Sequence, residues 1–387
     1  MDYFLTEGQQ ELRELARRIA LEKVKPVAAQ HDREGTFPYD LVKDFAQAGL
    51  FSVYVPEEWG GTGGGVLDLV IVTEELSRIC GGIALSVAAT ALGTFPILLS
   101  GNDEQKKRFM PDLVSGKKLA GFGLTEPSAG SDAGAIKTRA VRKGDKYILN
   151  GTKHFITNGT VAKIYTVVAS TDPERGSRGA STFIVEEGMP GFRYGKVNDK
   201  MGIRASKTSE LIFEDCEVPV ENMLGREGEG FKVAMRTLDR SRPGVAAQAL
   251  GIAQGAFDLA VKYSSEREQF GSKINTFQAI QFMLADMAIQ IEAARALVYA
   301  TAKMIDSGNE RVAKESAMCK VMASDVAMHV TTDAVQIFGG YGYMMDYPIE
   351  KFMRDAKITQ IYEGTNQIQR GVIGKAILRE VAQLKGL

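Results

Sequence analysis

Apolar positions divide the chain into two helical parts with a β-rich part between them. In residues 6–35 the apolar side chains recur at intervals of three and four with charges between them, at Leu12, Leu15, Ala16, Ile19 and Ala20. This spacing is typical of an amphipathic helix. Thr6, followed by Gln9, has the spacing of a capping box at its start. Similar patterns predict helices over residues 39–50, 67–80, 83–100 and 103–115.

The pattern changes between about residues 118 and 225. Short runs rich in β-branched and aromatic residues occur at 147–151, 165–169, 181–185 and 210–213, separated by Gly, Pro, Asn and Asp. Such runs predict a small all-β domain, either a barrel or a sandwich. The pair Asn150-Gly151 is a typical signal for a β-hairpin turn, so we expect a hairpin there.

From about residue 227 the spacing is helical again. Residues 277–305 and 311–338 form two long patterns that are rich in Ala and Met and largely apolar. Such helices are expected to be buried on more than one side, in a bundle core or at a subunit interface. The chain is therefore predicted to be α+β and mostly α. Its expected domains are a helical domain (1–116), a β domain (117–226) and a helical bundle (227–387).

Composition narrows the class of protein. The chain has 387 residues, 44% of them hydrophobic and 25% charged, with a formal net charge of −1. This balance is that of a soluble globular protein and gives no indication of binding to nucleic acid. Cys80, Cys216 and Cys319 are widely separated, which argues against both a disulfide framework and a metal site.

We expect that no stretch reaches the length of a membrane span, because charges interrupt the apolar stretches, and so no membrane insertion is expected. The N-terminal residues lack the basic and apolar regions of a signal peptide. We therefore expect a cytoplasmic bacterial protein, or a mitochondrial matrix protein if the chain is a processed eukaryotic one.

The most informative segment is residues 360–370, where a carboxylate lies between an aromatic residue and a glycine. Glu363 follows Tyr362 and precedes Gly364. A carboxylate at such a step can act as a base directed at a ligand. The same residues also fit the start of a helix, with Thr365 as N-cap and Glu363 stabilised by the helix dipole. The segment alone leaves both interpretations open.

Two segments of the β-rich part could face a flat ligand. Residues 121–132 contain small residues, which allow close approach of the backbone, and the hydroxyl donors Thr125 and Ser131. Phe155 and Thr157 are two residues apart, on one face of a predicted strand, which suits a ring with polar edges. The alternatives are a turn cluster in the first segment and an ordinary hairpin with a core phenylalanine in the second.

The C-terminal part contains further candidates for binding charged groups. Arg240 and Arg242, in a helical context, could bind phosphate or carboxylate, or could form a solvated helix face. Arg267 and Gln269 precede a glycine turn and could bind a pyrophosphate. The glycines of residues 336–342 end a long helix and could also let the backbone approach a ligand.

Taken together and in this order, these segments closely resemble the acyl-CoA dehydrogenase family, over essentially the whole chain. The most specific segments are 124–127 with 130–132, 269–271, 336–340 and 361–365. The short- and medium-chain branch, which includes butyryl-CoA dehydrogenase, is the most similar. The resemblance implies three domains, helical, β and four-helix bundle, usually in a homotetramer.

The resemblance also implies FAD as cofactor, bound between the β domain and the bundle and completed by a neighbouring subunit. The cofactor contacts carried over by motif are Phe122, Leu124, Thr125, Gly130 and Ser131 on the flavin and substrate side; Phe155 and Thr157 against the isoalloxazine ring; Arg267, Gln269, Phe270, Gln336 and Gly340 across the subunit interface; and Thr365 and Gln367 at the adenosine pyrophosphate.

For the substrate, the resemblance implies an acyl-CoA that becomes a trans-2-enoyl-CoA. Glu363 matches the catalytic base, which takes the α-proton while flavin N5 accepts the β-hydride. The implied substrate contacts are Ser131, Leu238, Asp239, Arg242, Tyr362 and Gly364. We expect the bound acyl chain to raise the pKa of Glu363 by desolvation. The reduced flavin would pass its electrons to an electron-transferring flavoprotein.

Some branches of the family place the base one residue before the CoA-binding arginine. Here that residue is Ser241, which cannot serve as a base, so the base is expected at Glu363. Residues 86–93 are expected to close the acyl pocket, and their small side chains do not indicate a pocket restricted to short chains. A branched or cyclic acyl group, an oxidase that reduces O₂, and a non-catalytic flavin-binding partner are the alternatives.

Overall fold

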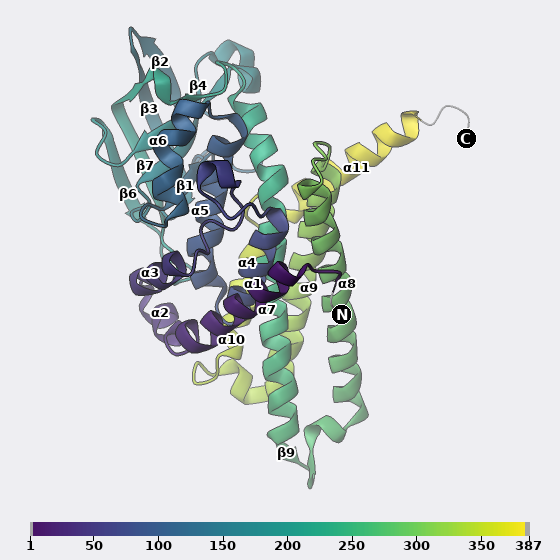
Figure 1. Ribbon diagram of the computed structural model, residues 1–387. Coiled ribbons are helices and arrows are strands. Elements are labelled where there is room, and N and C mark those ends of the chain that lie inside the picture. Colours follow the sequence, from purple (N-terminus) through teal and green to yellow (C-terminus); the bar gives the residue numbers. More distant parts are fainter. Residues whose placement is uncertain (1–2, 384–387) are drawn as a thin grey trace.

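The N-terminal part is helical in the computed structural model, which describes residues 3–383 (Figure 1). The outer limits expected for the first and last domains, residues 1 and 387, lie outside the described residues. The elements are α1 (Glu7–Ile19), the π-helical turn η1 (Ala20–Val24), α2 (Ala28–Glu34), α3 (Tyr39–Gln47), α4 (Val66–Ser77), α5 (Gly81–Ser100) and α6 (Asp103–Val114). The predicted capping box is confirmed, because Thr6 and Gln9 exchange hydrogen bonds of 3.2 Å.

An eight-stranded sheet forms the middle part, in the order β6-β7-β3-β2-β4-β5-β8, with β1 paired to β4. The strands are β1 (Ala120–Gly123), β2 (Arg139–Lys143), β3 (Lys146–Thr157), β4 (Ile164–Ser170), β5 (Ala180–Glu186), β6 (Phe192–Val197), β7 (Thr208–Pro219) and β8 (Met223–Leu224). All four predicted β-runs lie in this sheet. The prediction of an all-β middle domain is therefore confirmed.

The hairpin predicted at Asn150-Gly151 is wrong. Both residues lie inside β3, and the register against β7 shifts between Leu149 and Gly151 as at a β-bulge. Asn150 stabilises this irregularity, since its side chain and Asp215 exchange two hydrogen bonds of 2.8 and 3.1 Å. The turn between β2 and β3 lies instead at Gly144, which has a φ of 65°. The Asn-Gly pair here serves a bulge rather than a turn.

Long helices form the C-terminal part. They are α7 (Gly230–Glu266), α8 (Gln278–Asp306), α9 (Ala313–Phe338), α10 (Ile349–Thr359) and α11 (Asn366–Gln383), with the short strands β9 (Glu268–Gln269) and β10 (Ser272–Lys273) after α7. In Figure 1 helices α7, α8 and α9 run side by side, and α11 extends away from the body of the molecule. Helix α8 was expected to be buried on more than one side, in a bundle core or at a subunit interface, and on one face of it Phe282 and Ile289 are 60% and 65% exposed in the described chain. That face is the kind of surface that a subunit interface covers.

Two helical segments are long and apolar enough to cross a membrane by length and composition, Val66–Ser100 and Gly230–Glu266. The expectation that no stretch reaches this length is therefore wrong. Their most apolar windows are 78% and 72% buried inside the protein. They are the core helices α4, α5 and α7, packed against one another.

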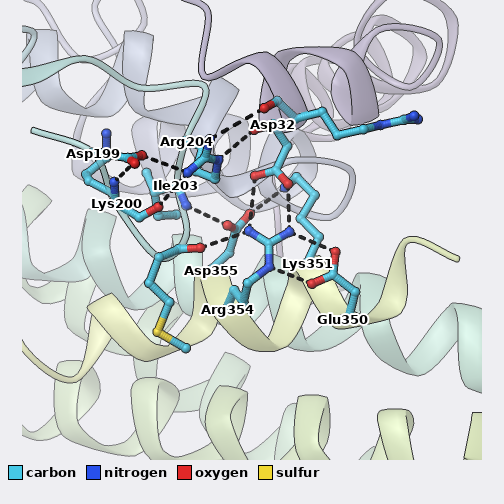
Figure 2. A network of polar contacts seen from close by, with 11 residues as sticks. Asp32, Asp199, Lys200, Ile203, Arg204, Glu350, Lys351, Arg354 and Asp355 are labelled. Atoms are coloured by element: carbon cyan, nitrogen blue, oxygen red, sulfur yellow. Dashed lines mark hydrogen bonds and ion pairs between the residues drawn. The ribbon is translucent and has the colours of Figure 1, made fainter. Parts of the chain in front are cut away.

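A buried polar network joins the three parts of the chain (Figure 2). The Arg354 guanidinium of α10 lies between the carboxylates of Asp32 on α2 and Glu350, with N–O distances of 2.7 and 2.8 Å. Asp355, on the same helix, is 1% exposed. It accepts hydrogen bonds from the Lys351 side chain and from the backbone N–H of Ile203 in the middle part. Because these contacts bind α10 on two sides, they fix the helix that leads directly into the segment containing Glu363.

Candidate active site

A cavity of about 480 Å³ lies where α5, the middle sheet, α7 and the turn before α11 meet. Most of the residues expected on the flavin and substrate side line it. They are Phe122, Leu124, Thr125, Gly130, Ser131, Phe155, Thr157, Leu238, Arg242, Tyr362, Glu363 and Gly364. Segments separated by more than two hundred residues in the sequence thus form one site.

Glu363 lies in a tight turn with an uncommon backbone. Its φ is 53° and that of Gly364 is 90°, both in the left-handed region that costs a non-glycine residue free energy. The Gln369 side chain holds the turn, because its Nε2 donates to the carbonyls of Glu363 (2.9 Å) and Gly364 (3.3 Å). A Cβ at residue 364 would lie 2.3 Å from that nitrogen, so the position requires glycine.

The helix-start interpretation of this segment is also confirmed, but for Thr365 rather than Glu363. Helix α11 begins at Asn366, and Thr365 Oγ1 accepts the N–H of Ile368 at 3.3 Å. Glu363 points instead into the cavity, away from the helix start. The two interpretations of the segment therefore apply to different residues within it.

The carboxylate of Glu363 is bound from α7. Ser241 Oγ donates a hydrogen bond of 2.5 Å to Glu363 Oε2, and Arg242 is the next residue of the helix. Burial raises the pKa of Glu363, while the Ser241 hydrogen bond and the positive charges of Arg242 and Lys320 work to lower it. The site thus holds a carboxylate that is desolvated yet still supported in its ionised form.

Arg242 is a buried cation rather than part of a solvated helix face. Its side chain is 6% exposed, and Nη1 donates to Asp239 at 2.7 Å. Asp239 therefore lies behind the arginine and orients it. Arg242 Nε has no hydrogen-bond partner within residues 3–383, and the side chain lines the cavity. An unpartnered buried donor at a cavity wall is costly unless a ligand supplies an acceptor.

The cavity lining includes an apolar wall from α5 and a hydrogen-bonded polar pair. Helix α5 contributes Leu85, Ala88, Ala89, Leu92 and Phe95, so the expected wall at residues 86–93 is only partly correct and includes larger neighbours. Tyr362 donates its phenolic hydrogen to Gln248 Oε1, and Gln248 Nε2 donates to the Gly81 carbonyl at 2.9 Å. Burial raises the pKa of Tyr362 well above its usual value, so this hydroxyl remains a donor.

The loop after β1 is held by a buried ion pair. Glu126 accepts a hydrogen bond of 2.6 Å from Lys153 Nζ, and it also accepts the N–H groups of Lys137 and Thr138 at 2.6 and 3.0 Å. Lys153 Nζ donates in addition to the Leu124 carbonyl at 3.0 Å. These bonds fix the loop that brings Thr125 and Ser131 to the cavity.

Phe155 is presented to the cavity rather than to the core. It has a φ of 58°, beside a register shift between β3 and β7, and its side chain is 60% exposed. Thr157 and Ile156 also line the cavity, although Ile156 is only 2% exposed. The alternative of a core phenylalanine is therefore wrong, and the ring offers an open aromatic face.

The residues expected at a subunit interface form a separate group. Arg267, Gln269 and Gly340 line a second cavity of about 560 Å³, while Phe270, at the tip of the β9–β10 turn, is 96% exposed. The exposed Gln336 belongs to the same end of α9, and the exposed Gln367 lies on α11. Arg267 follows Arg242 by about 37 Å along α7, at 1.5 Å per residue. Arg267 therefore lies at the C-terminal end of α7, far from Arg242 in the middle of the helix.

Three family models match the chain in succession. They describe the N-terminal domain (residues 6–117), the middle domain (121–216) and the C-terminal domain (228–378) of acyl-CoA dehydrogenase. The chain belongs to the acyl-CoA dehydrogenase family. The fold is that of the family, with one helical part before the central sheet and another after it along the chain. The protein is an enzyme of this flavoprotein class.

Individual relatives agree over the full length. A short-chain-specific acyl-CoA dehydrogenase of Clostridium acetobutylicum is 50% identical over 381 residues, covering 98% of this chain and 100% of the relative. The structure of butyryl-CoA dehydrogenase from Megasphaera elsdenii matches with a TM-score of 0.96 and 50% identity, over 98% and 100% of the two chains. A chain from work on the electron transferring flavoprotein of Acidaminococcus fermentans matches with a TM-score of 0.96 and 55% identity, over the same shares.

The site of this acyl-CoA dehydrogenase also contains residues that the sequence did not indicate. Gln248, Lys320 and Gln369 are each at most 1% exposed and are hydrogen-bonded around the Tyr362–Gly364 turn. Gln248 and Lys320 were signalled only as lone polar residues in apolar helical stretches, and Gln369, in the polar run 365–370, had no such signal. Within residues 3–383 no group of three or more His, Cys, Asp and Glu side chains is placed to hold a metal ion.

Proposed function

We propose that this enzyme converts a short- or medium-chain acyl-CoA to the trans-2-enoyl-CoA, with Glu363 as the base and FAD as the oxidant. The observation that carries this proposal is the partly buried Glu363 carboxylate in the cavity wall, bound by Ser241 on the neighbouring helix. An acyl thioester is acidic at the α-carbon, so its oxidation to the 2-enoyl thioester needs a base beside the α-carbon and a hydride acceptor beside the β-carbon.

The residues around the cavity fit a flavin. The open ring of Phe155 and the hydroxyl of Thr157 offer a flat face with a polar edge. Gln369 lines the same cavity, and its buried Oε1 has no hydrogen-bond partner within the described residues. Bound FAD would supply hydride acceptance at N5. The protein would hold the ring with Phe155 and Thr157 and with the backbone of residues 122–131.

Glu363 performs the proton transfer in this proposal. It must be ionised to accept the α-proton, and its raised pKa brings it closer to the weakly acidic thioester than an exposed carboxylate would be. The Ser241 hydrogen bond fixes Oε2, which orients the carboxylate toward the cavity. The N–H of Glu363 would donate to the thioester carbonyl oxygen and stabilise the charge that develops there.

The walls of the cavity support a straight acyl chain. Leucine, alanine and phenylalanine side chains of α5 form an apolar channel, which the Tyr362–Gln248 pair limits. Helix α5 contributes no arginine to this wall that could hold a second carboxylate, so a dicarboxylic acyl group is disfavoured. Ser131 and Arg242, at the other side of the cavity, would contact the CoA portion.

We also propose a homotetramer in the cytoplasm of a bacterium, with an electron-transferring flavoprotein as acceptor. The separation of the two groups along α7 supports the oligomer, because Arg267, Gln269, Phe270, Gln336 and Gly340 could reach the FAD of a neighbouring copy. Thr365 and Gln367 would contact its adenosine pyrophosphate. The match to a chain from work on an electron transferring flavoprotein supports the acceptor.

Anaerobic flavin reduction tests the reaction. We expect butyryl-, hexanoyl- or octanoyl-CoA to bleach the flavin absorbance of the purified holoenzyme. Glu363→Gln should retain FAD and bind acyl-CoA but lose reduction by about 10³-fold or more, since positioned proton transfer contributes roughly that much. Normal reduction by this variant would show that another group is the base. Rapid reoxidation of the reduced flavin by air would indicate an oxidase instead.

A further inference from the structure

Lys320 of α9 is fully buried and bonded to the turn that carries Glu363. Its ammonium donates to the Gly364 carbonyl and to Asn366 Oδ1, both at 2.9 Å. Asn366 is bonded in turn to Ser324 Oγ (2.9 Å) and Asp325 Oδ1 (2.8 Å). A buried ammonium is costly, and apolar packing alone would be served equally well by methionine. The cation therefore needs an explanation at this position.

We propose that Lys320 is a positioning residue for the base, which holds the Glu363–Gly364 turn in its left-handed conformation and supplies a buried positive charge behind the carboxylate. The inference rests on the proposed role of Glu363. It extends that role, because the residues that hold the base then come from two helices, Ser241 and Arg242 from α7 and Lys320 from α9.

Ser241 of α7 and Lys320 of α9 contact different parts of the turn. Ser241 contacts a carboxylate oxygen, whereas Lys320 contacts the carbonyl of the next residue and so acts on the backbone. Gln369 Nε2 donates to the same Gly364 carbonyl from α11. Because the φ of Glu363 is 53°, the turn is stable only if surrounding contacts outweigh the strain. Lys320 is the one charged side chain among these backbone contacts.

The charges around the turn set the direction of the effect on Glu363. The cations that act on its carboxylate are Arg242 and Lys320, and Arg242 is already paired with Asp239. Asp325, which faces Asn366 and Lys320, is bridged to Arg370 at 2.6 Å. Burial lowers the pKa of Lys320 to about 8, so the ammonium is charged across the acidic and neutral range. Its removal would disfavour the ionised form of Glu363.

The test compares Lys320→Gln and Lys320→Met, which are neutral, with Lys320→Arg, which keeps the charge. Each holoenzyme is measured for anaerobic flavin reduction by butyryl-CoA from pH 5 to 9, for FAD content and for thermal unfolding. In the neutral variants we expect the acidic limb of the pH profile of flavin reduction to move to higher pH by about one unit. At pH values below this limb the rate should fall about tenfold relative to the wild type. Lys320→Arg should restore the limb toward that of the wild type.

Lys314→Met is the matched control, because it removes a lysine charge from the same helix at a partly exposed position paired with Glu380. Its acidic limb should not move. The proposal would be overturned if the acidic limb of the pH profile were unchanged in either folded, FAD-loaded neutral variant, Lys320→Gln or Lys320→Met. If only one neutral variant folds, that variant decides. Glu363→Gln in the same assay distinguishes failure of this proposal from failure of the proposed function. Normal flavin reduction by that variant would refute the role of Glu363 as base, whatever the Lys320 variants show.

Discussion

Ser241 Oγ donates a hydrogen bond to the carboxylate of Glu363, although 122 positions separate the two residues in the sequence. The donor lies on α7 directly before Arg242, and the acceptor lies in the turn between α10 and α11. A residue that is too weak to be a base thus binds the carboxylate that we propose as the base. The site is built by packing the end of the chain against the middle of α7.

Loss of this hydrogen bond should make Glu363 harder to ionise. In Ser241→Ala we expect the acidic limb of the pH profile for kcat/KM to move upward by about one unit, because hydrogen bonds to a charged group contribute about 1.5–3 kcal/mol. Steady-state assays across pH with an artificial electron acceptor would measure the shift. Ser265→Ala, on the exposed end of the same helix, is the control and should leave the limb in place.

The Tyr362–Gln248 pair should limit the length of the acyl chain. Gln248→Ala shortens a side chain at the end of the channel and frees Tyr362 to move, so the ratio of octanoyl-CoA to butyryl-CoA reduction rates should rise several-fold. Stopped-flow measurement of flavin reduction gives this ratio. Gln248→Leu keeps the volume and should change the ratio much less. A ratio that fell in Gln248→Ala would contradict this assignment.

Removal of the carboxylate at Glu126 should destabilise the protein, because it leaves the Lys153 ammonium buried without a counter-charge. Both side chains of this pair are at most 4% exposed. We expect Glu126→Gln to lower the free energy of unfolding by about 3 kcal/mol, and to weaken FAD retention through the loop it holds. Thermal unfolding with and without added FAD measures both effects. Glu214→Gln breaks the exposed Glu214–Arg193 pair and should leave Tm unchanged.

The Glu126–Lys153 pair should also make the stability of the protein sensitive to acid. Burial works to raise the pKa of Glu126, but Lys153 and the Thr138 and Lys137 hydrogen bonds outweigh it and hold this pKa below 4.5. A lowered folded-state pKa contributes stability that is fully present above pH 4.5 and is lost as the pH falls through the folded value. The wild type should therefore lose more stability between pH 5 and pH 3 than Glu126→Gln does. Urea unfolding at the two pH values would show the difference, and equal losses would contradict it.

Local signals in the sequence determined most of the elements and led to the prediction of the base. The three- and four-residue spacing in residues 6–35 and the Thr6–Gln9 box depend on neighbours within one helical turn, and both were confirmed. Glu363 was recognised from the family pattern of residues 361–365. The Asn150-Gly151 hairpin was wrong, because the partner that decides its conformation, Asp215, lies on another strand.

What only the tertiary structure decided is the environment of the base. The sequence placed Glu363 beside a glycine, but its hydrogen bond to Ser241 and its backbone support from Lys320 join α7, α9 and the C-terminal turn. Such contacts depend on how distant helices pack, and hydrophobic periodicity does not specify which polar side chains then meet. The sequence by itself therefore predicted which residue takes the proton, whereas the packing of the bundle decided which buried groups surround that carboxylate.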